Sequence, residues 1–477
     1  MSVRLSHHRI FCTYNNGLTY HQHAASQKSA LNLYIRYGNM GPETERAVCT
    51  AQPEATIWSR VSENEFRQNL VALEHRTNAV PLDVLVFLPK DAATDPLRLP
   101  LRVEQQVADD LAFLVAVQEG AQSVAAVYLE QNLAKKALVV HVAAADSVGE
   151  DVRARLTRVC DILACVSRGS SNELNQMELL FDQIINQHQY KILSRLRSRR
   201  WEKPRYLAAS HKKPLWQDFE NVIHRVQHIY PSKKDKMQRQ SIGEQLEALR
   251  RCYQALEYCD NDVLVLRLQA LVKSTYVFCK HKDVAQYAAR LTELRPTAQI
   301  AAAVKCLSQL EKIGAYWRIA IDLVSSAIRY PRVFGEIKLV YLLPFASVPT
   351  SIAYESWAKT CHVHAEIQLV IEHDLQLARS ERQGCEVLPP RIIGTSKYLC
   401  YLCYLFIQHH GRFFVANTHG RLYDQWTVPD LAEYCDQTKA HYATLLAEMN
   451  EMVCKQLAGE TRWRPEPMTS RQNLLQT

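Results

Sequence analysis

The chain has 477 residues, of which 47% are hydrophobic and 22% charged, the composition of an ordinary water-soluble globular protein. It has no run of about 18 uninterrupted apolar residues, which excludes a membrane-spanning class, and its polar N-terminus lacks the pattern of a signal peptide. We therefore expect an intracellular protein, cytoplasmic or nuclear, whose 14 cysteines are buried or bind metal rather than form disulfides.

The net charge of +8 is concentrated in one stretch. Between Lys191 and Arg239 there are 14 Lys or Arg residues and four acids, a local balance of +10. Trp201 and Tyr206 lie among them, and basic side chains interleaved with aromatics suit a phosphate backbone with stacked bases. A solvated helix face followed by an exposed basic loop explains the same pattern. The stretch is therefore compatible with a nucleic-acid partner without establishing one.

Residues 1–330 are predicted to form a mostly helical N-terminal region of unknown role, which could also bind protein partners. The chain has only 14 glycines, and none lies between Gly243 and Gly314, which favours long helices. Short strands are expected at 84–88 and 137–142. The segment 204–240, rich in Lys, Pro and Ser, is a candidate linker. Apolar residues at helical spacing predict helices over 172–196, 242–258, 263–279, 284–294 and 300–313.

After residue 330 strands and helices alternate, which predicts an α/β/α domain over 331–460 followed by a tail at 461–477. The chain as a whole is thus predicted to be an α+β multi-domain protein. The expected strands of this domain are 335–344, 391–394 and 412–417. Its expected helices begin near residues 364, 400 and 429 and end near 377, 409 and 457.

Four residues of this domain have the pattern of a zinc-dependent enzyme, namely His364, Glu366, Cys400 and Cys403. The two cysteines, three apart, share one face of a first helical turn, where backbone amides favour the thiolate that binds zinc. Three protein ligands leave one tetrahedral position for water, and zinc lowers the pKa of that water to give hydroxide as nucleophile. Glu366 would then move protons as general base and acid. His-x-Glu followed by Cys-x-x-Cys is the order found in zinc-dependent base deaminases.

Three segments around these residues, 361–368, 393–403 and 418–426, carry a family resemblance. They resemble a fungal branch of the cytidine deaminase-like superfamily, the OTT-type nucleic-acid and nucleotide deaminases, over roughly residues 335–429 and not over the first 330. The resemblance implies that His364, Cys400 and Cys403 bind Zn²⁺ and that Glu366 is the catalytic proton shuttle. It also implies a mixed five-stranded sheet between helices. Leu399 departs from the superfamily, which has proline before the first cysteine.

Three further residues are candidates for binding the substrate. His419 is placed to hydrogen-bond a base edge, Trp426 to stack on the base, and Asn417 to contact a ribose or a base. A histidine or tryptophan in this position equally fits a core or rim side chain.

We predict a zinc-dependent hydrolytic deaminase that acts on a cytosine- or adenine-type base in a nucleotide or nucleic acid. The first alternative is a catalytically inactive deaminase-like protein whose structural zinc site supports an interaction scaffold. The second is a hydrolase that uses Cys361 as nucleophile together with His364 or His419.

Overall fold

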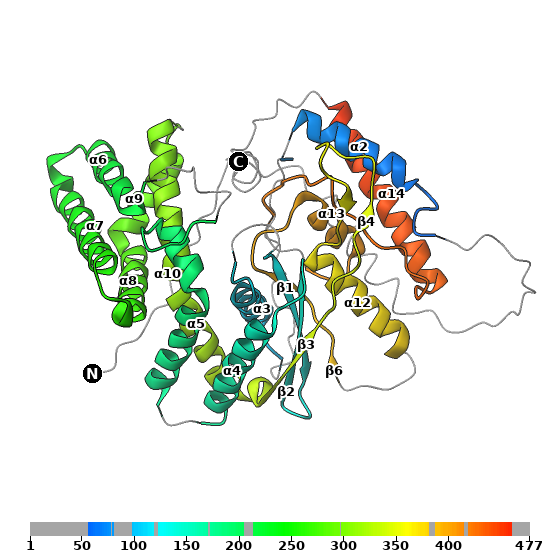
Figure 1. Cartoon of the computed structure of the whole chain (residues 1–477), viewed down its shortest axis with the longest axis horizontal. Helices are drawn as coiled ribbons and strands as arrows, with labels where there is room; N and C mark the ends of the chain where they lie inside the picture. The colour runs from blue at the N-terminus through cyan, green and yellow to red at the C-terminus, as the bar shows by residue number, and fades with distance from the viewer. Residues whose placement is uncertain are drawn as a thin grey trace, which may run out of the picture. The chain divides into compact units, whose positions relative to one another are not determined.

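The computed structural model in Figure 1 separates the chain into two compact units, each with its own core. We call residues 172–324 the helical unit; residues of 56–169 and 325–459 form the sheet unit. The predicted strand at 84–88 and the tail at 461–477 lie outside the described residues. The structure describes residues 56–77, 79–80, 98–118, 123–169, 172–204, 213–295, 297–380, 387–414 and 418–459.

The helical unit is built from long amphipathic helices. Its first helix is capped at the start by Asn172, whose side chain accepts a hydrogen bond from the amide of Asn175, and at the end by Arg197 in a left-handed conformation. Such caps satisfy amides and carbonyls that a helix leaves unpaired at its ends. Apolar side chains such as Phe181 and Leu268 form the core. The helices are α5 (Glu173–Leu196), α6 (Phe219–Ile229), α7 (Lys236–Glu257), α8 (Leu264–Lys280), α9 (Lys282–Glu293) and α10 (Ala298–Arg329), with 3₁₀ turns η2 (Leu215–Asp218), η3 (Lys233–Asp235) and η4 (Asn261–Val263).

The helices predicted here are confirmed, and α10 extends well beyond the predicted end at residue 313. The candidate linker at 204–240 is wrong over its described part, because this part contains η2, α6 and the start of α7. Phe219, Val222 and Val226 are buried at helical spacing within α6 and anchor it to the core. The basic and polar composition of the segment concealed this apolar stripe.

The sheet unit contains a mixed five-stranded sheet in the order β3-β2-β1-β6, with β7 also paired to β1. β1 pairs antiparallel with β2, β6 and β7, whereas β2 and β3 run parallel. The α+β class and the mixed five-stranded sheet are therefore confirmed. The strands are β1 (Ala125–Asn132), β2 (Ala137–Ala144), β3 (Glu336–Tyr341), β6 (Val387–Leu388) and β7 (Ile393–Thr395), and a separate ladder joins β4 (Val348–Pro349) to β5 (Thr360–Cys361).

The predicted boundary at residue 330 differs from the division in the structure. Strand β2, which was predicted at 137–142, and strand β1, which was not predicted, both lie within residues 1–330 but form the centre of the sheet. Ala126 pairs with Thr395, and Ala137 pairs with Glu336. The helical unit therefore interrupts the sheet unit between α4 (Glu150–Ser167) and the end of α10. Pairings between such distant segments leave no mark in the local pattern.

Helices cover both faces of the sheet, as Figure 1 shows, with α3 and α4 on one side and α12 on the other. Side chains alternate across β1, so that Tyr128 belongs to the core beneath α12, whereas Val127 is buried on the opposite face. The predicted strand at 412–417 appears as a single bridge from Phe414 to Ile392, with 415–417 outside the described residues. The helices are α2 (Glu63–Arg76), α3 (Leu101–Val115), α4 (Glu150–Ser167), α11 (Pro331–Phe334), α12 (Ala365–Ser380), α13 (Tyr401–His410) and α14 (Asp436–Ala458).

Candidate metal and active site

His364 and Glu366 lie at the start of α12, which is attached to the sheet. The His364 carbonyl accepts a hydrogen bond from the Gln368 amide at 3.0 Å, so the helix begins at this histidine. The Gln368 side chain donates to the carbonyls of Ala144 and Val363, at 3.1 and 3.0 Å. These contacts join the first turn of α12 to the end of β2. Glu366 follows in that first turn and is buried.

The two cysteines lie at the start of α13, which follows β7. Cys400 is the N-cap residue of this helix, and its sulfur accepts a hydrogen bond from the Cys403 amide at 3.4 Å. The helix therefore begins without the proline that the superfamily has at residue 399. Leu399 instead bridges to Thr418 in the segment after α13. Both sulfurs face the same side of the first turn, as their spacing predicted.

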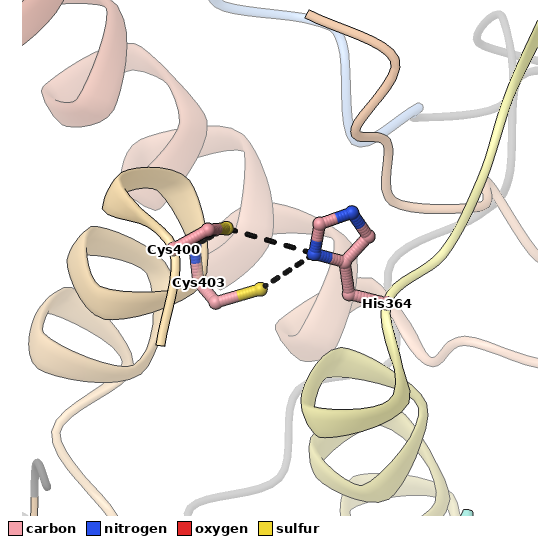
Figure 2. Close-up of side chains that lie close together, drawn as sticks. All are labelled: His364, Cys400 and Cys403. Atoms are coloured by element: carbon pink, nitrogen blue, oxygen red, sulfur yellow. Dashed lines mark hydrogen bonds between the residues drawn. The ribbon is translucent and has the colours of Figure 1, made fainter. Parts of the chain in front are cut away.

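The two helix starts bring His364, Cys400 and Cys403 together, as Figure 2 shows. Nδ1 of His364 lies 3.6 Å from Sγ of Cys400 and 3.3 Å from Sγ of Cys403. All three ligand atoms lie within 4.8 Å of one another. Tetrahedral zinc holds its sulfur and nitrogen ligands about 3.5 Å apart. The three residues therefore form a group that could hold a metal ion, and the spacing of their ligand atoms suits zinc.

Glu366 lies beside this group rather than within it. Its Oε2 is 3.8 Å from Sγ of Cys403, and only 3% of the residue is exposed. Burial raises the pKa of the Glu366 carboxyl, against the opposing effect of His364. The carboxyl group is therefore close to the three ligand atoms and shielded from bulk water.

The electrostatics of the two sulfurs differ. Burial opposes ionisation of both, yet the pKa of the Cys400 thiol lies well below its ordinary value because Cys403 and His364 stabilise the thiolate. Burial and the charge on Cys400 raise the pKa of Cys403 well above its ordinary value. The thiolate therefore resides on the helix N-cap residue, where backbone amides favour it.

Trp426 occupies a different position from the one we expected. The residue is 1% exposed, and its ring packs between Phe66 and Phe406, so that no face is open to a stacking base. The expected stacking role is therefore wrong, because this large apolar ring is buried in the core instead of facing the site. Its indole Nε1–H is buried without a regular hydrogen-bond partner, and lies close enough to Cys403 to favour the thiolate there. A metal-bound sulfur would supply an acceptor for this N–H.

His419, the second expected substrate residue, does lie near the ligand group. Its amide donates to the Leu399 carbonyl at 3.1 Å. Burial lowers the pKa of His419 to about 4, and the nearby Cys400 thiolate opposes that shift. Asn417, the third expected residue, lies outside the described part of the chain.

Two residues that the sequence did not single out also lie near the site. The ring of Tyr423 is 6.1 Å from that of His364 and 6.2 Å from that of His419. The Thr418 hydroxyl donates to the Leu399 carbonyl at 2.8 Å. Both belong to the segment 418–426 that carried the resemblance, but no spacing rule distinguished them from their neighbours.

Cys361 does not have the surroundings of a nucleophile. Its side chain is fully buried, and burial raises the pKa of its thiol. The guanidinium of Arg67 contacts its sulfur and also donates to the Thr427 hydroxyl at 3.2 Å. This environment makes a hydrolase that uses Cys361 a poor fit.

Several basic residues of the stretch 191–239 are used within the helical unit. Lys191 is 4% exposed. Arg197 pairs with Asp218 at 2.6 Å, and Nε of Arg199 donates to the Glu257 carbonyl at 3.0 Å. These side chains cap helices and join them together, so the stretch is not a continuous solvated strip, and its role toward nucleic acid stays a prediction.

No helix in the described ranges is both long and apolar enough to cross a membrane.

The site lies in a segment of the chain that matches a known protein family. Residues 363–430 match the family model described as "OTT_1508_deam:-like deaminase". No curated protein and no solved structure matches the chain. The matched segment contains His364, Cys400 and Cys403, whose side chains meet in the structure, and Glu366, which lies beside them. The C-terminal part of this chain therefore contains a deaminase-like domain.

Proposed function

We propose that the protein is a zinc-dependent hydrolytic deaminase of a cytosine- or adenine-type base, carried by a nucleotide or a nucleic acid. One observation carries the proposal: His364, Cys400 and Cys403 converge within 4.8 Å inside the segment that matches a deaminase family. Glu366 lies beside them and is not one of the three. Three ligands with an adjacent carboxylate are what a catalytic zinc site requires, whereas a structural site uses four protein ligands.

Each residue has a defined task in this reaction. His364, Cys400 and Cys403 would hold the metal, which when bound supplies Lewis-acid activation of water near neutral pH. Glu366 accepts a proton from the attacking water and delivers it to the ring nitrogen next to the reacting carbon. A second proton transfer allows the carbon–nitrogen bond to break, so that a carbonyl replaces the amino group and ammonia leaves. The buried position of Glu366 keeps this exchange away from bulk water.

The proposal is tested by measuring zinc content and ammonia release on the same purified full-length samples. We expect about one zinc per chain in the wild type and its loss in Cys403→Ser. Glu366→Gln should retain zinc and lose turnover by a factor of roughly 10²–10⁴. Glu451→Gln, which changes an exposed glutamate of α14, is the matched control and should behave as wild type.

The outcomes separate an enzyme from a scaffold. Cytidine, adenosine and single-stranded RNA and DNA containing cytosine and adenine serve as substrates. Zinc bound through Cys403 without ammonia from any of them would overturn the enzymatic proposal and favour a structural zinc site. A folded wild type that neither contains nor takes up zinc would overturn both.

A further inference from the structure

The loop that carries His419 is held against the ligand helix. The Thr418 hydroxyl and the His419 amide both donate to the Leu399 carbonyl, at 2.8 and 3.1 Å. The Tyr401 amide donates to the Arg421 carbonyl at 2.8 Å. These contacts flank Cys400 on both sides, so the loop 418–421 cannot shift without moving the start of α13.

The other side of the loop is fixed by a distant part of the chain. The Val80 amide donates to the Gly420 carbonyl at 2.7 Å, and Ala79 forms a bridge with Arg421. Gly420 has a φ of +66°, and a Cβ atom there would lie 2.1 Å from the Val80 carbonyl oxygen. Only glycine fits this close approach. The backbone around His419 is therefore set before any substrate arrives.

The hydrogen bond at one ring nitrogen determines the tautomer of His419. Nδ1 accepts the backbone N–H of Arg421 at 3.1 Å, and an accepting nitrogen cannot carry a proton. The proton of the neutral ring is therefore on Nε2. The ring is half-buried, and no described group accepts a hydrogen bond from Nε2. This nitrogen is not fully buried, so a ligand can reach it. The loop thus holds the His419 ring in place and leaves its Nε2–H as a donor without an acceptor among the described groups.

This donor lies close to the metal-ligand group. The centroid of the Tyr423 ring is 6.1 Å from that of the His364 ring and 6.2 Å from that of the His419 ring. His419 also lies within electrostatic range of Cys400 and His364. A base bound at the three ligand atoms would therefore lie near His419.

We propose that His419 is a substrate-positioning residue whose Nε2–H donates a hydrogen bond to an acceptor atom on the ring of the base being deaminated. The inference rests on the proposed function and names the chemistry that the substrate must offer. For cytosine the acceptor is O2, and for adenine it is N7. Neither acceptor is the ring nitrogen that takes the proton, which is N3 in cytosine and N1 in adenine, so the contact orients the base without taking part in bond breaking.

Two substitutions separate this role from a structural one. His419→Asn keeps an oxygen near the position of Nδ1, and so preserves the acceptor for the Arg421 amide while removing the distal donor. His419→Gln places an amide N–H near the position of Nε2 and gives up the loop contact. A structural role predicts that Asn is the better replacement, whereas the positioning role predicts that Gln is. His228→Asn, an exposed histidine of the helical unit, is the matched control.

The experiment measures kcat/KM for ammonia release and equilibrium binding of cytidine and adenosine to zinc-loaded full-length protein. We expect His419→Asn to lower kcat/KM about 10-fold, the loss of one directed hydrogen bond, with zinc content and melting temperature unchanged. His419→Gln should recover part of this loss. On the active base, wild type should discriminate against the analogue with a weakened or missing acceptor, 2-thiocytidine or 7-deazaadenosine, and His419→Asn should not.

Failure of the inference differs from failure of the proposed function. The inference alone is overturned if His419→Asn leaves kcat/KM unchanged, or if wild type and His419→Asn discriminate equally against the analogue. Binding that depends on His419 without any ammonia release supports the hydrogen bond from His419 to a bound base and overturns the enzymatic proposal. Absence of both binding and turnover overturns both.

Discussion

The helical unit and the sheet unit hold their cores together over different distances along the chain. In the helical unit α7 packs on α8, the next long helix, and α8 packs on α9. In the sheet unit the amide of Ala125 donates to the hydroxyl of Ser396, 271 positions away. These helices pack against neighbours in sequence, whereas the hairpin of β1 and β2 gains its other strands, β3, β6 and β7, only from beyond the inserted helical unit.

This difference sets where each unit is sensitive to change. Long-range packing brings backbones into close contact, as where Gly394 of β7 meets Ala108 of α3. It also buries charged groups whose ion-pair partner is distant in sequence, as with Glu104 and Arg391. The candidate site is built from such long-range contacts, so we expect the sheet unit to be the more fragile of the two.

The largest expected effect comes from adding a side chain at Gly394, where two backbone segments lie close together. A Cβ atom there would lie 2.3 Å from the Ala108 carbonyl carbon, which belongs to backbone that cannot rotate away. Gly394→Ala should therefore destabilise the sheet unit by on the order of 5 kcal/mol. Gly243→Ala in α7, where a Cβ would meet nothing within 4 Å, should instead stabilise the helical unit by about 1 kcal/mol. Urea unfolding, monitored by hydrogen exchange in each unit, measures both changes in unfolding free energy. Changes of equal size and sign in the two units would contradict the comparison.

Breaking the buried ion pair comes next. The Glu104 side chain is fully buried, and Nε of Arg391 donates to it at 2.9 Å. Arg391→Ala removes the guanidinium from this buried carboxyl, which keeps only the amide of residue 391 and Gln131 as hydrogen-bond donors, and should cost about 4 kcal/mol of unfolding free energy. Arg318→Ala, which removes the partly exposed pair with Asp322 in the helical unit, should cost about 0.5 kcal/mol. Chemical denaturation of both variants measures the two costs. A cost below 1 kcal/mol for Arg391→Ala would show that water reaches Glu104.

Acid should weaken the sheet unit through His373. Burial lowers the pKa of this histidine to about 4, so the folded protein resists a proton that the unfolded chain accepts near pH 6.5. Its contribution is present above pH 6.5 and is lost as the pH falls toward 4, about 3 kcal/mol in all. The charged or titratable groups acting on it are Asp374, Arg412, Glu130 and His410.

His373→Phe tests this dependence. The ring lies against Tyr128 and Phe413, so phenylalanine preserves the packing and removes the titration. Hydrogen exchange in β1 and α12 between pH 7 and 4 should show a shallower loss of protection in the variant than in wild type. An unchanged slope would assign the acid sensitivity to another group.

The smallest expected effect is on the metal itself. Trp426→Phe keeps the ring between Phe66 and Phe406 but removes the N–H near Cys403. Loss of a partner to a ligating sulfur should weaken zinc binding about 10-fold. Competition with a chromophoric chelator measures this affinity. Unaltered affinity would mean that the indole N–H serves packing alone.

The residues of the candidate site could be read from sequence because their spacing is local. His364 and Glu366 lie two positions apart, Cys400 and Cys403 three apart, and each pair starts a helix. The helices of the helical unit were predicted for the same reason, since apolar residues recur at a helical period along one segment. Family resemblance added the roles of these residues but not their surroundings.

Tertiary structure decided the surroundings. Trp426 looked like a stacking residue and proved to be core, because burial depends on packing against Phe66 and Phe406 from other elements. The support of His419 by Val80 depends on a contact between distant segments, as does the role of β1 and β2 in the sheet. The apolar period of a helix and the spacing of ligand residues are patterns within a few residues, and so the sequence identifies both ligands and helices. Strand pairing, burial and the orientation of a loop come from the free energy of the whole fold, which no short segment contains.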